Sequence, residues 1–269
     1  HNRKHSFPTR RSSDLGALEP YDEDAPDIVK LIHWGADVTL TQQLTHEFLK
    51  GELAYFLYAW PVLKEWLPQQ NYDAVLAYVQ AHWAATEADQ EYPYDTSPES
   101  HNLFAVKTHV GSNKGEYPPG HSLMPNLLMH AVAERDGLPG AERYFQAAYH
   151  QAEWIIQELD WEEPLTTKGQ RMSEHITMTG LAAFRQMHPE RAPEGLQAKI
   201  EAWVDIMIRR SDNLWDFRKL TDDGQWTPSG ERRTMWNEPG NVVGFPAAVL
   251  AARPFIEDET ERERLTELA

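Results

Sequence analysis

The sequence predicts an all-α protein in which buried helices alternate with one-faced helices. Residues 122–133, 176–184 and 242–252 contain no Asp, Glu, Lys or Arg, and a helix that is apolar on every side must be surrounded by other elements. Residues 142–159 and 196–210 instead place their apolar side chains on one stripe, as outer helices do. A double ring of inner and outer helices produces this alternation, because inner helices touch neighbours all round.

The earlier part of the chain follows the same pattern. Asp24 is a suitable N-cap and Pro26 suits a first turn, so a helix is expected over about 27–38. Residues 41–67 continue helical, and 54–63 within them lack charge, which predicts another inner helix, kinked at its proline. A one-faced helix is then expected to start at Asn71 or Asp73 and to end near Asp89.

The links between helices differ in length according to their direction. Links that enter the inner helices are long, at 92–119, 160–172 and 211–240, whereas those that leave them are as short as DGLPG and PERAPEG. In an antiparallel arrangement of helix pairs, all the long links fall on one rim, where the inner helices begin. Long irregular links in compact domains are often functional, so we expect the functional surface there.

Residues 6–15 resemble the translation of a common sequencing adapter, so residues 1–15 are expected to be an artefactual tail and 16–269 one helical domain. Leaving out the tail's four basic residues and one acidic residue moves the formal net charge from −17 to −20. The tail, and a final helical pattern without a stop signal, predict a domain truncated at both ends.

The composition excludes several kinds of protein. An acidic chain disfavours nucleic acid and anionic membrane as partners, and no uncharged run is long enough to span a bilayer. The absence of cysteine excludes disulfides, thiolate metal sites and a cysteine nucleophile. The histidines form no compact metal motif and no phosphate-binding glycine loop is present, so the sequence predicts no metal and no cofactor.

With its alternating helices and one elaborated rim, the chain from about residue 24 to 269 resembles the six-hairpin, or (α/α) toroid, architecture of many glycoside hydrolases and polysaccharide lyases. The resemblance is one of pattern, covers about four hairpins of a larger ring, and includes no family-specific catalytic motif. It implies a carbohydrate substrate bound on the rim where the inner helices start. It also favours a periplasmic or secreted location, although the sequence itself does not fix one.

The long links carry the residue types that bind sugars. A pyranose has an apolar C–H face, on which Tyr117, Trp226 and Trp236 are the candidates to stack. Cations gathered on the rim of an acidic chain favour a substrate with carboxylate or sulfate groups. The candidates for these polar contacts are Lys107, His109, His121, Arg171, Arg232 and Asn237. The alternative is that the cations are simply solvated and the tryptophans fix their own loops.

Glycoside hydrolysis needs one carboxyl group as acid and another as nucleophile or base. Glu238, just ahead of an inner helix, is the first candidate, followed by Glu174 and Asp216. Each of these carboxylates could instead stabilise the start of a helix. The sequence does not give the separation of the carboxyl groups, so retention and inversion of configuration both remain open.

A polysaccharide lyase is the second hypothesis. It needs a base, for which Tyr117, His109 and His175 are candidates, and Arg or Asn side chains that neutralise the uronate carboxylate. Arg171, Arg232 and Asn237 could serve there, although the Asn-His pairs of heparinase-like and alginate-lyase-like toroids are absent. A glycan-binding ring without catalysis and a plain helical scaffold are the remaining hypotheses. A lone helical histidine such as His175 is more often structural.

Overall fold

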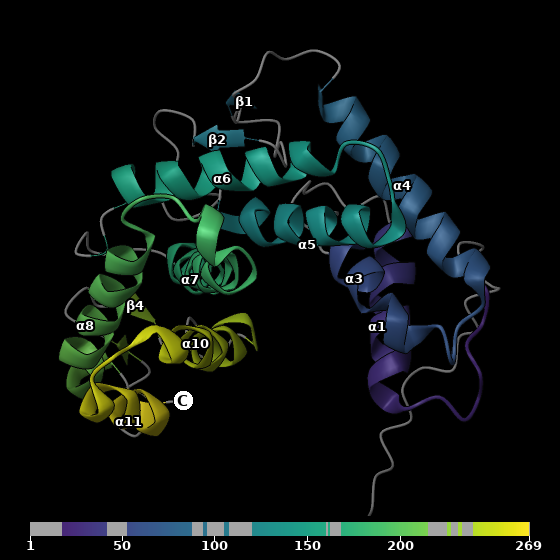
Figure 1. The fold of residues 1–269 in the computed structure, drawn as a ribbon. Coiled ribbons are helices and arrows are strands. Elements are labelled where there is room, and N and C mark those ends of the chain that lie inside the picture. Colours follow the sequence, from purple (N-terminus) through teal and green to yellow (C-terminus); the bar gives the residue numbers. More distant parts are fainter. Residues whose placement is uncertain are drawn as a thin grey trace, which may run out of the picture.

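The computed structural model describes residues 18–41, 53–87, 94–95, 105–107, 120–159, 161, 168–214, 225–226, 231–232 and 239–268, and it is built of helices (Figure 1). The all-α class is therefore confirmed. Strands among these residues are two or three residues long. The helices are α1 (Asp27–Thr41), α3 (Leu53–Leu63), α4 (Gln69–Glu87), α5 (Gly120–Asp136), α6 (Ala141–Glu158), α7 (Lys168–Met187), α8 (Leu196–Leu214), α10 (Pro239–Ala252) and α11 (Glu259–Leu268), with the short 3-10 helices η2 (Pro189–Arg191) and η4 (Arg253–Phe255).

The helices form two layers along an open arc (Figure 1). In the inner layer, α3 contacts α5, α5 contacts α7, and α7 contacts α10. Each inner helix also contacts the helix that follows it in the outer layer, which are α4, α6, α8 and α11 in that order. The helix α1 packs against α3 and α4. Buried and one-faced helices therefore alternate along the chain because alternate helices belong to different layers.

Burial agrees with this division in the middle of the arc. Every described side chain of α5 from Ser122 to Ala133, and of α7 from His175 to Phe184, is buried or half-buried. The outer helix α6 buries Phe145, Ala148, Ala152 and Ile155 and exposes Glu142 and Glu158. The predicted distinction between inner and outer helices is confirmed for these elements.

The same expectation is wrong at the two ends of the arc. On α3, Tyr55, Tyr58 and Val62 are exposed, at 44%, 48% and 68%, and on α10 Leu250 is 55% exposed. Within the inner layer, the extensive contacts of α3 are with α5, and those of α10 are with α7. Each end helix therefore keeps an open face that a uniformly apolar sequence does not reveal.

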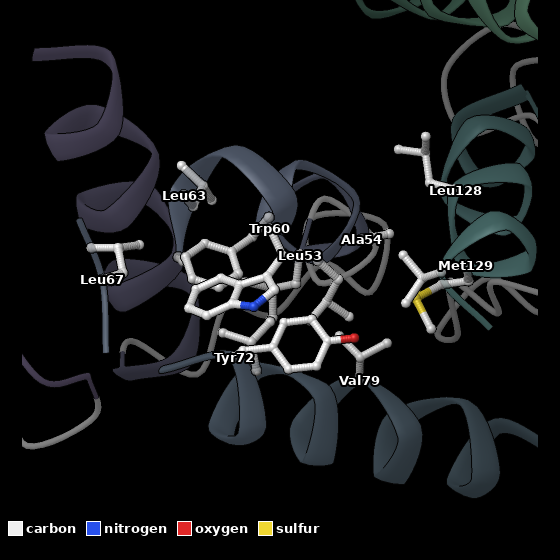
Figure 2. Close-up of a cluster of buried hydrophobic side chains, with 14 of the residues drawn as sticks. Leu53, Ala54, Trp60, Leu63, Leu67, Tyr72, Val79, Leu128 and Met129 are labelled. Carbon is white, nitrogen blue, oxygen red and sulfur yellow. The ribbon is translucent and has the colours of Figure 1, made fainter. Parts of the chain in front are cut away.

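Two hydrophobic clusters make up the core. The first joins α1, α3 and α4 to one side of α5, and Figure 2 shows Trp60 against Tyr72, whose ring centroids are 5.2 Å apart, with Leu128 and Met129 of α5 facing them. The second cluster joins α5 and α6 to α7, α8, α10 and α11 and includes Leu123 and Leu127. The α5–α6 pair thus contributes to both.

Two helices extend beyond the predicted limits. The helix α7 begins at Lys168 rather than after residue 172, because Gln170, Arg171 and Met172 are good helix formers even though the segment looks like a polar loop. The helix α8 continues to Leu214, a few residues into the stretch predicted as a link. Arg171 therefore belongs to an inner helix and not to the loop ahead of it.

The segment before α1 is held by buried polar side chains. The backbone N–H of Glu19 donates to Asn71 Oδ1 at 2.6 Å, and Asn71 Nδ2 donates to the Glu19 carbonyl at 2.8 Å. His33 Nε2 also lies 2.9 Å from this carbonyl. Asn71 and His33 are buried. These contacts tie the start of the described chain to both α1 and α4.

Candidate functional site

The candidate site lies where the inner helices α5, α7 and α10 begin. Two pairs of short strands lie in the chain ahead of these helices. β1 (Tyr94–Asp95) and β2 (Ala105–Lys107) pair in parallel before α5, and β2 contacts α6, over which it lies in Figure 1. β3 (Gln225–Trp226) and β4 (Glu231–Arg232) pair antiparallel before α10. The long links therefore contain local structure.

Apart from His175, six of the predicted site residues have a described backbone. Lys107 ends β2, where the register pairs it with Asp95. Trp226 and Arg232 belong to one hairpin, in which Trp226 pairs with Glu231 and Arg232 with Gln225. The other three, His121, Arg171 and Glu174, lie in the first two turns of α5 and α7. All six are thus placed on the chain that leads into, or begins, an inner helix.

The remaining predicted residues apart from His175 lie outside the described residues. Their convergence with the residues above therefore stays a prediction, and so does the pairing of carboxyl groups. These residues are His109, Tyr117, Asp216, Trp236, Asn237 and Glu238.

His175 is the predicted site residue whose side chain is described. It lies in α7, its side chain is 3% exposed, and its carbonyl accepts a hydrogen bond from Thr179 Oγ1 at 2.9 Å. A general base must come within hydrogen-bond reach of the proton that it takes. A buried ring is typical of a histidine that positions its helix, so the catalytic role of His175 stays a prediction.

Beneath the starts of the inner helices, buried polar side chains join the layers. Asn126 Nδ2 of α5 donates to Gln151 Oε1 of α6 at 3.1 Å, and both residues are fully buried. Ser122 and Thr177 are also buried there. A hydrogen bond between two buried amides is directional, so it fixes the register of α5 on α6.

This amide pair was missed in the sequence, although a signal was present. Gln151 falls within the apolar stripe of 142–159, between Ala148 and Ala152, and Asn126 interrupts the apolar run of 122–133. A polar side chain on a buried face requires a partner. Two such residues on successive helices therefore predict each other.

The inner helices α5 and α7 approach each other closely in the same region. A Cβ atom built at Gly180 of α7 would lie 3.0 Å from Leu123 Cδ2 and 3.2 Å from Leu123 Cγ of α5. Leu123 is fully buried. Glycine at position 180 thus lets the two inner helices approach each other closely, whereas a larger side chain would push them apart.

A second cluster of polar and aromatic groups lies at the opposite ends of α5 and α7. The rings of His130 and His188 have centroids 5.0 Å apart, and both contact the ring of Phe145, at 5.3 and 5.1 Å. The guanidinium carbon of Arg191 lies 3.4 Å from the Phe145 centroid, and its Nη2 lies 2.6 Å from Glu142 Oε1. None of the predicted site residues belongs to this cluster.

Burial lowers the pKa of His188, and the neighbouring His130 and Arg191 lower it further against the opposing effect of Glu134 and Glu142. On the other ring, His130 Nδ1 lies 3.0 Å from the Ala141 carbonyl, and its Nε2 lies 3.7 Å from Glu134 Oε2. The signal in the sequence is positional, because each histidine falls near the C-terminal end of an apolar helix and just ahead of a short link.

The described residues include no group of three or more His, Asp or Glu side chains placed to hold a metal ion. None of the described helices combines the length and the hydropathy needed to cross a membrane. No protein-family model matches this chain, and neither a curated protein nor a solved structure matches it.

Proposed function

We propose that this chain is part of an (α/α) toroid of a carbohydrate-active enzyme, and that it is a glycoside hydrolase acting on acidic or decorated oligosaccharides or polysaccharides. The observation that carries the proposal is the two-layered arc, in which α3, α5, α7 and α10 contact one another in order and each is backed by the next helix. In a toroid, this arrangement brings the starts of all inner helices to one rim. The step from architecture to carbohydrate chemistry rests on the resemblance.

The chemistry is assigned to the chain that precedes α10. Glu238 immediately precedes Pro239, the first residue of α10, and acts as the general acid, with Asp216 as the second carboxyl group. The β3–β4 hairpin brings Trp226 and Arg232, the proposed stacking residue and the proposed carboxylate-binding residue, into one local unit at adjacent register pairs. Trp236 and Tyr117 supply further stacking surfaces, and Arg171, Asn237, His109, Lys107 and His121 the polar contacts.

A lyase is the second candidate, favoured by one observation. Because α7 starts at Lys168, Arg171 and His175 are one helical turn apart at the beginning of an inner helix. A base and a residue that neutralises a uronate carboxylate need such proximity. Tyr117 is the alternative base for this reaction.

The two candidates give different products from the same substrate. The full chain is incubated with matched panels of neutral and uronate-containing oligosaccharides. A hydrolase releases new reducing ends without ultraviolet absorbance, whereas a lyase also generates the absorbance of an unsaturated uronate. Reducing ends from the uronate panel, with no absorbance, are the expected result.

The remaining outcomes decide against catalysis. Oligosaccharide binding without either product, measured by calorimetry on the same panels, would indicate a glycan-binding domain. Absence of both binding and products would overturn the carbohydrate assignment of this chain and leave a helical scaffold.

A further inference from the structure

We propose that His130 and His188 form a proton-sensitive contact that holds the link between α7 and α8 on the start of α6 at neutral pH and releases it under mildly acidic conditions. The contact lies at the ends of the inner helices opposite to the rim assigned to the substrate. It does not depend on the proposed function.

The first support is the way in which three elements meet at the two rings. His130 comes from α5, Phe145 from the second turn of α6, and His188 from the residue that follows α7. His188 also packs on Phe184, with ring centroids 5.9 Å apart. The His188 side chain thus packs the start of the link between α7 and α8 against α5 and α6.

The second support is the hydrogen bonding of the two rings. His130 Nδ1 donates to the Ala141 carbonyl at 3.0 Å, which fixes the orientation of the ring and the tautomer of its neutral form. His188 Nε2 is buried and has no hydrogen-bond partner within the described part of the chain. A neutral imidazole tolerates one unused acceptor, whereas a protonated ring would place an N–H donor there without an acceptor.

The third support is the charge around His188 on every element packed against it. His130 and Glu134 face it from α5, Glu142 from α6 and Arg191 from η2. Glu142 is already engaged by Arg191 at 2.6 Å, and Glu134 lies nearest His130, at 3.7 Å from its Nε2. Each carboxylate thus has a cationic or potentially cationic partner other than His188, so a proton on His188 meets His130 and Arg191 with little compensation.

Release follows from this competition. A protonated His188 would hold a buried N–H without an acceptor and would face the guanidinium of Arg191, so acid favours a state in which the His188 ring has separated from its neighbours. Separation exposes His188 to water and lifts η2, with Arg191, from the Phe145 ring. The release is expected below the ordinary pKa of histidine, because burial lowers the pKa of His188.

Hydrogen exchange of single backbone amides tests the proposal on the full chain. The reporters are the amide of His188, bonded to the Phe184 carbonyl at 2.9 Å, and the amide of Arg191, bonded to the His188 carbonyl at 3.1 Å. The Leu159 amide, bonded to the Ile155 carbonyl at 3.2 Å at the far end of α6, is the internal reference. The exchange rate of each amide is measured from about pH 7.5 to 5 and compared with the intrinsic exchange rate of an unprotected amide at the same pH, which gives its protection.

Protection at the two reporters is expected to fall by up to about tenfold per pH unit below about pH 6.5, as for an opening that takes up one proton. The Leu159 amide should keep its protection over the same range. Equal loss at all three amides would mean general acid unfolding and would overturn the proposal, as would unchanged protection at His188 and Arg191.

Three variants distinguish the effect of the His130–His188 contact from the effect of protonating other histidines of the chain. His188→Phe keeps the aromatic packing and cannot titrate, so protection at Arg191 should become independent of pH. His130→Asn keeps a donor for the Ala141 carbonyl, removes the neighbouring charge, and should reduce the fall. His150→Gln changes a histidine on α6 paired with Glu153 at 2.9 Å and should leave the fall as in the wild type. An unaltered fall in both His188→Phe and His130→Asn would overturn the proposal.

Discussion

Arg135 donates a hydrogen bond from Nη2 to the carbonyl oxygen of Leu57 at 3.1 Å. Leu57 lies four residues before Pro61, inside α3, and proline has no N–H to donate to that carbonyl. The guanidinium of α5 thus replaces the bond that the proline removes. Arg135 Nη1 also donates to the Tyr58 carbonyl at 3.2 Å, so one side chain joins two inner helices through backbone atoms.

Replacing Arg135 by Met should lower the free energy of unfolding by about 1–3 kcal/mol, because the Leu57 carbonyl loses its donor in a buried setting. The measurement is urea unfolding followed by circular dichroism. Pro61→Ala restores an N–H at position 61, so Arg135→Met should cost less in that background. Equal costs in the two backgrounds would show that Arg135 acts mainly through Asp136, whose Oδ1 lies 2.7 Å from Arg135 Nε.

Gly180 and Gly35 form a matched pair for a second prediction. Both lie inside helices, where alanine is favoured over glycine by about 1 kcal/mol. A Cβ at Gly35 meets no atom within 4 Å, whereas one at Gly180 meets Leu123 at 3.0 Å. Gly35→Ala should therefore raise the thermal midpoint and Gly180→Ala should lower it, with a cost of about 1–3 kcal/mol from overpacking. A gain for both would show that Leu123 moves aside freely.

The stability of the chain should fall as the pH falls through the ordinary pKa of histidine, and His33 should carry part of this loss. Burial lowers the pKa of His33 against the raising effects of its hydrogen bond to Glu19 and of Asp37. As the pH falls, the unfolded chain therefore binds a proton on His33 at a higher pH than the folded chain does. The contribution of neutral His33 to the free energy of unfolding is fully present above about pH 6.5 and is lost below it.

His33→Gln tests this prediction, because an amide can still donate to the Glu19 carbonyl but cannot titrate. The slope of unfolding free energy against pH between about 5 and 7 should be smaller in the variant than in the wild type. Asp37, whose pKa burial raises, has the opposite sign and acts at lower pH, where its protonated form favours the folded chain. An unchanged slope in this window would exclude His33 as a contributor.

Glu238→Gln should lower the turnover of a uronate-containing oligosaccharide by about 10²–10⁴-fold, since general acid catalysis contributes about this much. Glu231→Gln, on the β4 strand of the same link, is the matched control and should retain turnover. Substrate binding should survive in both variants. Loss of turnover in the control alone would assign the acid to the hairpin instead.

The sequence was sufficient to predict the all-α class and, in the middle of the arc, the distinction between enclosed and one-faced helices. An uncharged run such as 176–184 and a striped one such as 142–159 differ in composition because one is enclosed and the other has a wet face, and α7 and α6 behave accordingly. Whether a helix is enclosed or has a face in water is reflected in its own residues. The two kinds of helix could therefore be predicted without knowing which helices are in contact.

What escaped prediction depends on pairs of residues far apart in the sequence. Asn126 with Gln151, and His130 with His188, are recognisable as partners only once α5, α6 and α7 are packed together. The open faces of α3 and α10 likewise follow from their places at the ends of the arc. The predicted site residues, most of which lie in the links, stay a prediction for the same reason: their meeting depends on the tertiary structure of those links.

Neighbouring residues of α5 belong to different hydrophobic clusters, and this affects how the arc unfolds. Leu127 packs with the residues of α7 and α8, and Leu128 with those of α3 and α4. The arc therefore has no seam at which it divides into two self-sufficient halves. A chain cut on either side of this hairpin would leave one apolar flank of α5 uncovered, so melting at one end of the arc should spread to the other as a single cooperative transition.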